Sequence, residues 1–519
     1  MSERSKRTIT PLVIVAALLH TAPAFAHGFG QRYDLPVPLW LYLTGAAAAV
    51  IFSFVMIGLF VRGTPGLHSY PRLNLLKTRI GRLFAHPVVL TTCKLVSVTL
   101  FFLIMLTGLL GSQNPTKNLT PTLIWVIWWV GLAYVSALIG DLWAFINPWK
   151  IIFSWAENLY RRFDPEGELP LNLPYPSWLG VWPGFFFFVV FAWIELVYSG
   201  RAWPANLAFL TFLYSAVTWL GMFLFGRERW LKCGEAFSIA FGLLARFAPT
   251  EVRVTNEEVC SLCSLECRDL SGECINCYEC FELAEDEERE WNLRPFAVGL
   301  LRNEAISPSL TAFVILMLAT VTFDGFTATP LFGSLESNLF ALMPFIGEWR
   351  ITVIDTLGLV AFPTLFLLVY LFVCRLMVAA SGGKLPVEAL ARAFVFSLIP
   401  IALAYHLAHY LSYLLIQGQL IIPILSDPFG WGWNLFGTAA YRINIAVVGA
   451  RFAWFAAVSA IVLGHIIAVY LAHVIALRNL REPEAALRSQ YPMLALMVSY
   501  TVVSLWIIAQ PIVESGAGG

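Results

Sequence analysis

The sequence predicts an all-α polytopic membrane protein with about ten transmembrane helices and a small cytoplasmic Cys-rich module. Hydrophobic residues make up 59% of the 519 residues and charged residues only 13%, which is about half the charged fraction of a typical soluble domain. The mean hydropathy is +0.73, and apolar runs long enough to cross a bilayer recur along the chain. Six of the nine cysteines fall between residues 260 and 280.

The first 26 residues have the three parts of a secretory signal peptide. Arg4, Lys6 and Arg7 give a positive start, a short apolar stretch follows, and residues 24–26 (AFA) form a small-x-small cleavage site. The apolar stretch is too short to span a bilayer well. We therefore expect residues 1–26 to be a signal peptide, and His27 to become the N-terminus on the outer side of the membrane.

Ten apolar runs predict the membrane spans. The runs are 39–60, 88–110, 122–142, 178–198, 206–225, 309–332, 352–376, 394–416, 452–477 and 493–512. They divide the mature chain into a first membrane half at 27–226, a loop with the Cys-rich module at 227–307, and a second membrane half at 308–519. The loop at 417–450 is expected to cap the outer face.

The placement of Lys and Arg predicts the orientation. With the mature N-terminus outside, the large majority of basic residues fall in inside loops, and the outside loops hold only a few. These few are Arg32, Lys117, Arg201, Arg350, Arg442 and Arg451. This bias follows the positive-inside rule, and ten spans return the C-terminus to the outside. The Cys-rich module is therefore expected on the cytoplasmic side.

The clustered cysteines form two runs, C-x2-C-x3-C and C-x2-C-x2-C. They are Cys260, Cys263, Cys267, Cys274, Cys277 and Cys280. Two C-x2-C knuckles that face each other wrap a tetrahedral zinc ion. The second run also resembles part of a ferredoxin cluster sequence, without the usual fourth Cys followed by Pro. Because disulfides rarely persist on the reducing side of a membrane, we expect bound metal, with zinc favoured over an iron–sulfur cluster. Free thiols in a loop are the alternative.

Ionisable residues fall at a similar depth on several spans. His406 and His409 share a face of the eighth span, and the helical rise places them in its outer half, level with Glu195 and Asp324 on two other spans. Such residues inside a bilayer are costly and mark functional sites. We expect a zinc or copper site of the two-His, carboxylate kind, with His27 as a further ligand that suits copper. Interhelical hydrogen bonds or ion pairs are the alternative.

Several function classes lack support. Charge is balanced, with 33 basic and 33 acidic residues, so nothing indicates a nucleic-acid partner. The sequence contains no Walker loop, no dinucleotide fingerprint and no Gly-x-Ser-x-Gly elbow. ATP-driven transport and serine-dependent hydrolysis of the usual kind are therefore not indicated.

Eight short segments resemble one family. They are HGFGQRYDLPVPLW at 27–40, GSQNP at 111–115, INPW at 146–149, FAWIELVY at 191–198, GEAFSIAFGLLAR at 234–246, TFDG at 322–325, AYHLAHY at 404–410 and SQYP at 489–492. Together they resemble the bacterial integral membrane proteins of the fenitrothion hydrolase family, over nearly the whole mature chain. The resemblance implies a bacterial inner-membrane protein that hydrolyses an organophosphate triester to a nitrophenol and a dialkyl thiophosphate.

The hydrolysis that the resemblance implies would depend on a metal, because metalloenzymes hydrolyse triesters with a Lewis acid and an activated water. The ionisable residues of the spans are the ones that would hold this metal. His406 and His409 would bind the metal, Asp324 would be a ligand, and Glu195 would be a ligand or the general base. A lipophilic substrate would enter from the bilayer. By the residues alone, a transition-metal transporter is favoured, with the same layer as transit site and the thiolates as receivers. A redox or assembly subunit with an iron–sulfur cluster is the third hypothesis.

Overall fold

The computed structural model describes residues 33–61, 70–261, 263, 267–268, 274–302, 304–383, 385–480 and 482–514. The expected signal peptide and His27 lie outside these residues. Within the described part, ten helices or helical runs are long and apolar enough to cross a membrane. This confirms the prediction of an all-α polytopic membrane protein.

The spans follow the predicted order, and most predicted bounds agree within a few residues. The first five are α2 (Leu39–Phe60), α4 (Pro87–Leu110), the run Leu119–Leu138 made of α5 (Leu119–Pro121), η3 (Thr122–Gly131) and α6 (Leu132–Leu138), the run Ser177–Leu196 with α9 (Trp182–Leu196), and α10 (Pro204–Phe225). The sixth and seventh are α15 (Pro308–Thr327) and the run Pro344–Ala380 with α17 (Arg350–Ala380). The eighth is the run Val387–Ser426, which contains α18 (Val387–Phe394), α19 (Ile399–Gln417) and α20 (Ile421–Ser426), and the last two are α21 (Ala450–Asn479) and α22 (Pro483–Ile512).

Two departures from the predicted spans have local causes. The sixth span stops at Thr327 because Thr329 caps a new helix, α16 (Pro330–Leu342), which has Pro330 in its first turn. The third span contains a π-helical stretch, η3 (Thr122–Gly131), in place of regular α-helix. Such stretches are rare and frequently lie at functional sites.

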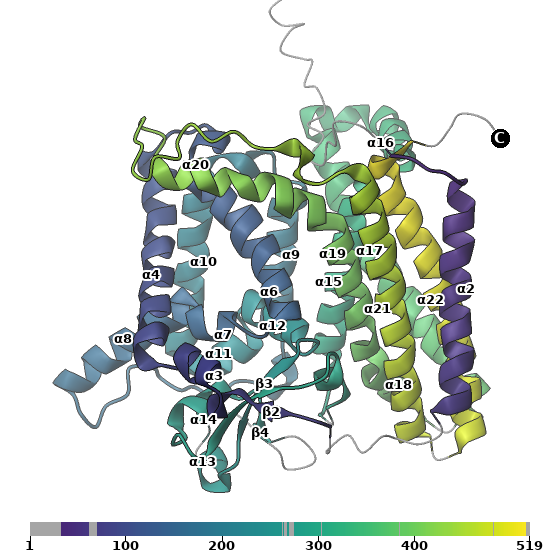
Figure 1. Cartoon of the computed structure of the whole chain (residues 1–519), viewed down its shortest axis with the longest axis horizontal. Helices are drawn as coiled ribbons and strands as arrows, with labels where there is room; N and C mark the ends of the chain where they lie inside the picture. Colours follow the sequence, from purple (N-terminus) through teal and green to yellow (C-terminus); the bar gives the residue numbers. More distant parts are fainter. Residues whose placement is uncertain are drawn as a thin grey trace, which may run out of the picture.

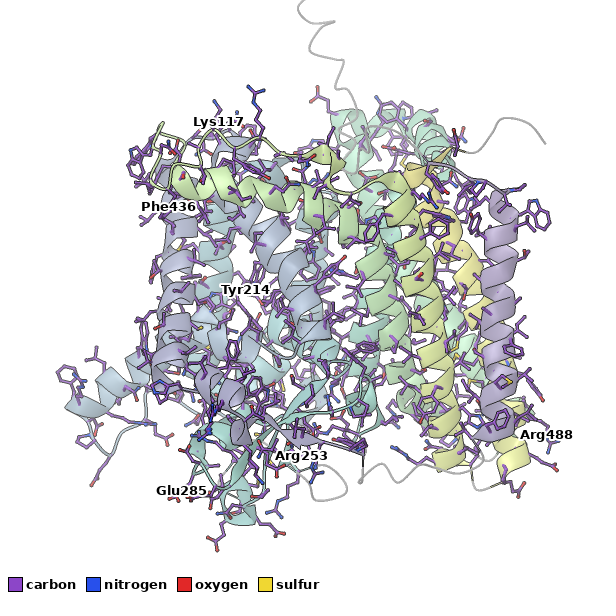
Figure 2. All side chains as sticks on the ribbon, in the orientation of Figure 1. Lys117, Tyr214, Arg253, Glu285, Phe436 and Arg488 are labelled. Carbon is purple, nitrogen blue, oxygen red and sulfur yellow. The ribbon has the colours of Figure 1, made fainter. Side chains whose placement is uncertain are left out.

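The helices stand side by side in one body, with a small strand-containing module at one end (Figure 1). Across the opposite end lie α20 and the segment after it, as expected for the loop at 417–450. The amide of Ser112 donates to the carbonyl of Phe429 at 2.7 Å, and that of Leu119 to Pro428 at 3.1 Å. Figure 2 shows Lys117 and Phe436 at this end and Arg253 and Glu285 at the other.

Both described chain ends lie at the end of the body opposite the module. The short strand β1 (Tyr33–Asp34) pairs in parallel with β6 (Val513–Glu514), so the first and last described segments meet. An even number of spans brings the two ends of a chain to one face, and ten spans do so here.

Two segments predicted as inside loops enter the helical body. The hydroxyl of Ser97 in α4 donates to the carbonyl of Ile146, just before α8 (Pro148–Phe163). Ser97 lies ten residues into α4, which is roughly 15 Å of helix. Further along, α12 (Ala236–Ala245) is almost entirely buried and packs against α6 and α9. An apolar run of ten residues is too short to span a bilayer, so hydropathy gives no sign of its position.

The module at the end of the body is a small antiparallel sheet with two short helices. Its strands lie in the order β2 (Leu73–Asn74), β5 (Arg289–Leu293), β3 (Thr250–Val254) and β4 (Cys274–Ile275). The helices are α13 (Glu257–Ser261) and α14 (Tyr278–Leu283). Apart from β2, the module thus begins at residue 250, so the part of the predicted loop before residue 250 belongs to the helical body.

Buried ionic contacts hold the sheet together. The Glu251 carboxylate on β3 bonds Arg294 at 2.7 Å and Arg253 at 2.6 Å, and it accepts a hydrogen bond from the Tyr70 hydroxyl at 2.6 Å. Burial acts to raise the pKa of Glu251, but the attraction of Arg294 and these hydrogen bonds outweigh it, so the pKa lies below its ordinary value. The ion pair therefore stabilises the sheet at neutral pH, and this contribution is lost as the pH falls through the lowered pKa.

A close contact between small residues sets the distance between α19 and α21. A Cβ added at Gly464 would lie 2.4 Å from the Cβ of Ala404 and 2.7 Å from the carbonyl oxygen of Pro400. We expect Gly464→Ala to push the helices apart and to lower the free energy of unfolding by about 1–3 kcal/mol. Thermal unfolding in detergent measures this. Gly45→Ala on α2, where an added Cβ meets nothing within 4 Å, is the control, and equal unfolding temperatures for both variants would contradict the contact.

Candidate metal centre

The fold of the module brings both cysteine runs to one place. Cys260 lies on α13 and Cys274 lies on β4, while Cys277 is the N-cap residue of α14 and Cys280 lies in its first turn. Since β4 pairs with β3 and α13 follows β3, the first and second runs face each other across the strand pair. All nine cysteines of the chain are present as thiols.

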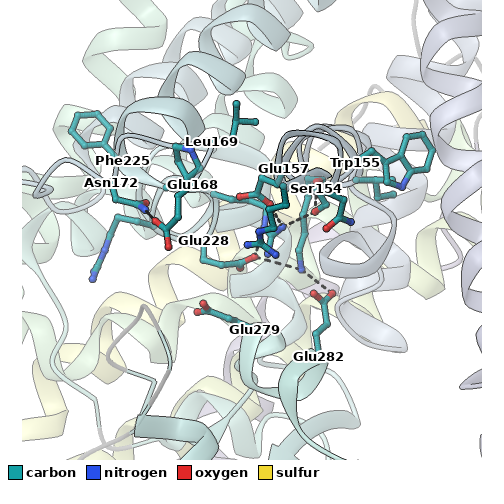
Figure 3. A pocket seen from close by; sticks show the side chains of 18 of the residues that line it. Ser154, Trp155, Glu157, Glu168, Leu169, Asn172, Phe225, Glu228, Glu279 and Glu282 are labelled. Atoms are coloured by element: carbon teal, nitrogen blue, oxygen red, sulfur yellow. Dashed lines mark hydrogen bonds and ion pairs between the residues drawn. The ribbon is translucent and has the colours of Figure 1, made fainter. Parts of the chain in front are cut away.

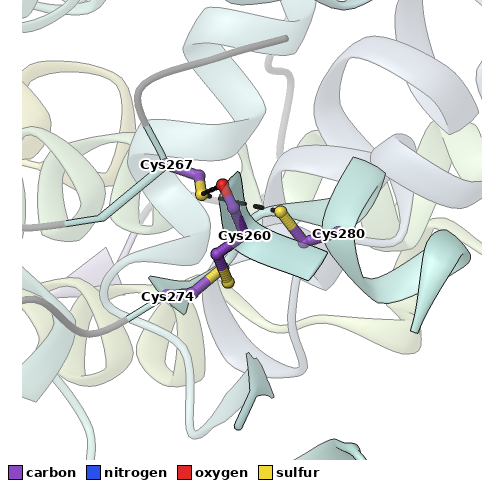
Figure 4. Close-up of side chains that lie close together, drawn as sticks. All are labelled: Cys260, Cys267, Cys274 and Cys280. Atoms are coloured by element: carbon purple, nitrogen blue, oxygen red, sulfur yellow. Dashed lines mark hydrogen bonds between the residues drawn. The ribbon is translucent and has the colours of Figure 1, made fainter. Parts of the chain in front are cut away.

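Two groups of four cysteines have metal-binding geometry. In one group the Sγ atoms of Cys260, Cys267, Cys274 and Cys280 all lie within 4.8 Å of one another. In the other the Sγ atoms of Cys263, Cys267, Cys277 and Cys280 do so. Figure 4 shows the first group, with side chains pointing toward one another. The six predicted cysteine ligands therefore converge as predicted.

The spacing of the sulfur atoms fits a tetrahedral thiolate site. The Sγ atoms of Cys263 and Cys277 are 3.5 Å apart, and so are those of Cys267 and Cys280. Zinc–sulfur bonds of 2.3 Å in a tetrahedron place neighbouring sulfur atoms about 3.8 Å apart. A small outward movement of each sulfur would admit an ion, and the all-sulfur donor set suits zinc, copper(I) or an iron–sulfur cluster.

Hydrogen bonding within the cluster favours the thiolate form of Cys277. A hydrogen bond from Cys274 lowers the pKa of Cys277 to about 5, whereas burial is the main cause that raises the pKa of Cys260 above its ordinary value. The carboxylate of Glu279 accepts from Cys263 Sγ at 3.2 Å. Metal binding replaces such S–H hydrogen bonds with metal–sulfur bonds and releases the protons.

Of the four ionisable residues predicted as a catalytic or metal site, His409 and Asp324 contact each other directly. The Nε2 atom of His409 lies 2.9 Å from Asp324 Oδ2, and the Tyr410 hydroxyl donates to the same oxygen at 2.6 Å. The Glu195 carboxylate accepts a hydrogen bond from Trp129 Nε1 at 2.8 Å. Trp129 belongs to the π-helical stretch η3, which is thus placed at this cluster.

A cavity of about 40 Å³ lies between these residues. Glu195, Asp324, His406 and Tyr410 line it together with apolar side chains from α6, α9, α12, α15 and α19. His406 is 8% exposed, and its Nε2 atom has no hydrogen-bond partner within the described part of the chain. An unpartnered polar atom in a buried cavity indicates room for a bound ion or water.

The ligand atoms of His406, His409 and Asp324 do not converge on one position that a single metal ion could occupy. Among the described residues, only cysteines supply three or more ligand atoms within 4.8 Å of one another. The histidines share a helix face, yet His409 faces Asp324 while His406 faces Trp129 and Tyr134. The roles of these residues as metal ligands or catalysts stay predictions.

No family model, curated protein or solved structure matches this chain. The resemblance to the fenitrothion hydrolase family stays a prediction from the motifs. Geometry adds residues that those motifs contain but that sequence reasoning did not single out. Tyr410 ends the segment AYHLAHY and bonds Asp324, and Glu235 opens the buried helix α12.

Glu235 joins several segments of the first membrane half through hydrogen bonds. Its fully buried carboxylate accepts hydrogen bonds from the amides of Phe237 and Ser238 at 2.9 and 2.7 Å, and from the Tyr214 hydroxyl at 2.6 Å. Figure 2 shows Tyr214 in the interior of the helical body. Asn147 lies beside Glu235, with 3.5 Å between its Nδ2 and Oε2, and caps α8. The segments INPW and GEAFS thus meet where two helices begin inside the body.

A polar cleft of about 770 Å³ separates the module from α8 and α11 (Arg227–Cys233). Both basic and acidic side chains line the cleft, and the dashed lines in Figure 3 mark hydrogen bonds and ion pairs among them. Lys150 on α8 lies 3.2 Å from Glu282 on α14 and 3.9 Å from Glu228 on α11. This ammonium therefore joins the helical body to the helix that carries Cys280.

Loss of the Lys150 ammonium should loosen the module. We expect Lys150→Met to cost about 1.5–3 kcal/mol, the usual contribution of a hydrogen bond to a charged group, and to speed hydrogen exchange in α14 at least tenfold. Mass spectrometry of peptides from residues 278–293 measures this exchange. Lys117→Met, at an exposed site at the other end of the body, is the control. Unchanged exchange in the Lys150 variant would show that the module is seated by other contacts.

Proposed function

We propose that the protein is a membrane-embedded transition-metal transporter, in which the Cys module is the receiving site on the cytoplasmic side. The convergence of six cysteines into two tetrads carries this proposal. Two helices at the same end of the body as the module, α3 (Arg79–Phe84) and α8, carry the basic residues Arg79, Arg82, Arg161 and Arg162. These residues support the cytoplasmic placement through the positive-inside rule.

The size of the buried cavity favours an ion over an organic substrate. Sites for drug-sized molecules occupy about 300–1,000 Å³, whereas the cavity between Glu195, Asp324 and His406 measures about 40 Å³. One water needs roughly 10–15 Å³ on the same scale. The cavity therefore accommodates a metal ion with a water or two, and a nitrophenyl triester does not fit without a large opening.

The direction of the cavity supports a path toward the module. Its lining includes Met317, Thr320 and Asp324 on successive turns of α15, so it extends along about 10 Å of that helix. The lining also includes Ala240 and Leu244 of α12. The module begins at Thr250, shortly after α12 ends at Ala245.

The cavity and the Cys module offer different ligand atoms, and this difference suits movement of a metal ion from the cavity to the module. Carboxylates and imidazoles in the cavity bind a divalent metal through oxygen and nitrogen, and they exchange it readily when the site is not closed. Thiolates bind zinc and copper(I) more strongly. In this scheme Asp324 and Glu195 offset the ion's charge in the body, His406 Nε2 offers a nitrogen ligand, and the cysteines retain the arriving ion.

Metal flux into proteoliposomes tests the proposal. Vesicles with the purified full chain and an internal zinc-sensitive dye receive external zinc, and a parallel series uses copper(I) with its own dye. We expect dye response to rise at least tenfold over protein-free vesicles for one of the two metals. Flux equal to that of protein-free vesicles with both metals, from protein that retains its fold, would overturn transport.

The hydrolase implied by the resemblance is a second proposal, supported by the meeting of Glu195, Asp324, His406 and Tyr410 at one cavity. It requires the cavity to open toward the bilayer. The test is release of nitrophenol from a nitrophenyl phosphotriester by the purified protein with added zinc. Hydrolysis requires turnover that His406→Ala lowers at least 100-fold, and no metal-dependent turnover in a folded preparation would remove this proposal.

A further inference from the structure

We infer that the Cys module holds two metal ions in one six-cysteine cluster, with the thiolates of Cys267 and Cys280 shared between them. The inference rests on the proposed metal-binding role of the module and specifies its stoichiometry. The two tetrads overlap in these two residues and in no others. Overlap of this kind is the geometry of two tetrahedra that share an edge.

The sequence order repeats within the two runs. The first cysteine of each run, Cys260 or Cys274, belongs only to one tetrad. The second of each run, Cys263 or Cys277, belongs only to the other tetrad, and the third of each run, Cys267 or Cys280, belongs to both. Each run thus supplies one terminal ligand to each metal ion and one bridging ligand. A chain that held a single ion would have no need for this symmetry.

Distances agree with the assignment of the bridging pair. The Sγ atoms of Cys267 and Cys280 are 3.5 Å apart, which is the shared edge of the two tetrahedra. With metal–sulfur bonds of about 2.3 Å, two sulfur atoms this far apart can both lie within bonding distance of an ion on either side. Cys280 is fully buried, as expected of a ligand at the centre of the cluster.

Burial also favours ligands from both tetrads, because the four buried cysteines do not all belong to either tetrad. Cys260, Cys274, Cys277 and Cys280 are each less than 9% exposed. One tetrahedral ion uses four of the cysteines, and a cubane iron–sulfur cluster also uses four. Either leaves two sulfurs of the group without a metal, although they lie against the ligands. Two divalent ions use all six and offset more of the buried negative charge.

Native mass spectrometry measures the number of metal ions per chain. The full chain is purified in detergent from cells grown with zinc. We expect two zinc ions per chain and no inorganic sulfide. One zinc ion per chain would overturn the two-ion cluster while leaving the metal-binding role intact. Inorganic sulfide together with iron and visible absorption would replace it with an iron–sulfur cluster. Absence of any metal would overturn both the cluster and the proposed receiving site.

Exchange of zinc for cadmium identifies the bridges. Cadmium-113 NMR should give two resonances in the range of all-sulfur coordination, coupled to each other through shared thiolates. Cys260→Ser should remove one of the two ions, because Cys260 is terminal to one tetrad only. Cys267→Ser should disturb both resonances. Two uncoupled resonances, or a single ion lost in both variants alike, would contradict the bridging role. The coupling between the two resonances is read from the wild type, so this part of the test does not depend on whether a variant folds.

Discussion

Replacement of both Cys274 and Cys277 by serine should remove all bound metal from the purified protein. Cys274 belongs to one tetrad and Cys277 to the other, so the double change leaves each tetrad one sulfur short. A serine hydroxyl is a poor ligand for zinc or copper(I), and removal of a thiolate ligand from a structural site abolishes most of its binding free energy. We expect the metal content to fall at least tenfold, measured by plasma mass spectrometry.

The matched control for this experiment is Cys93→Ser. Cys93 is exposed on α4 and lies outside the module, so its removal changes the number of thiols without touching the tetrads. It should retain the wild-type metal content. Equal metal in the double variant and in the wild type would mean that the cysteines hold no metal and that the transport proposal has lost its receiving site.

The second large effect is expected from Asp324→Asn in the helical body. Oδ2 of Asp324 accepts the Tyr410 hydroxyl and lies 2.9 Å from His409 Nε2, and the side chain lines the cavity with Glu195. The change keeps the shape but removes a negative charge that a passing cation needs in a medium of low dielectric constant. We expect metal flux into proteoliposomes to fall at least tenfold, with the metal content of the Cys module unchanged.

Glu348→Gln is the control for the loss of a carboxylate, because Glu348 is exposed and lies before α17, at the end of the body opposite the module. It should keep wild-type flux. If Asp324→Asn transports metal as fast as the wild type, the cavity is not on the path. If it loses flux and module metal together, the change has unfolded the protein and a smaller substitution, Tyr410→Phe, takes its place.

Much of the fold follows from local sequence properties. Ten apolar runs predict the ten spans because each span must satisfy its own backbone in lipid, and the cysteine runs predict a metal site because ligand spacing is local. By contrast, α12 and the start of α8 are short segments, and only contacts with distant residues such as Ser97 and Tyr214 hold them inside the body. Length and hydropathy carry no information on such contacts.

The sequence predicts at which depth in the membrane the candidate site lies, but it does not predict which side chains contact one another there. Counting along the helices places Glu195, Asp324 and the two histidines in one layer, and the structure brings Asp324 to His409 and Glu195 to Trp129. The rotation of each helix about its axis decides which side chains meet. That rotation is set by packing between spans, for example at Gly464 and Ala404.

The most direct test of the central claim is X-ray absorption spectroscopy at the metal edge of the purified wild-type protein. Metal bound by the cysteines of the module gives a first shell of sulfur alone, with bonds of about 2.3 Å for zinc, and two ions that share Cys267 and Cys280 add a metal–metal scattering path. A first shell of nitrogen and oxygen would place the metal away from the cysteines and would contradict the account.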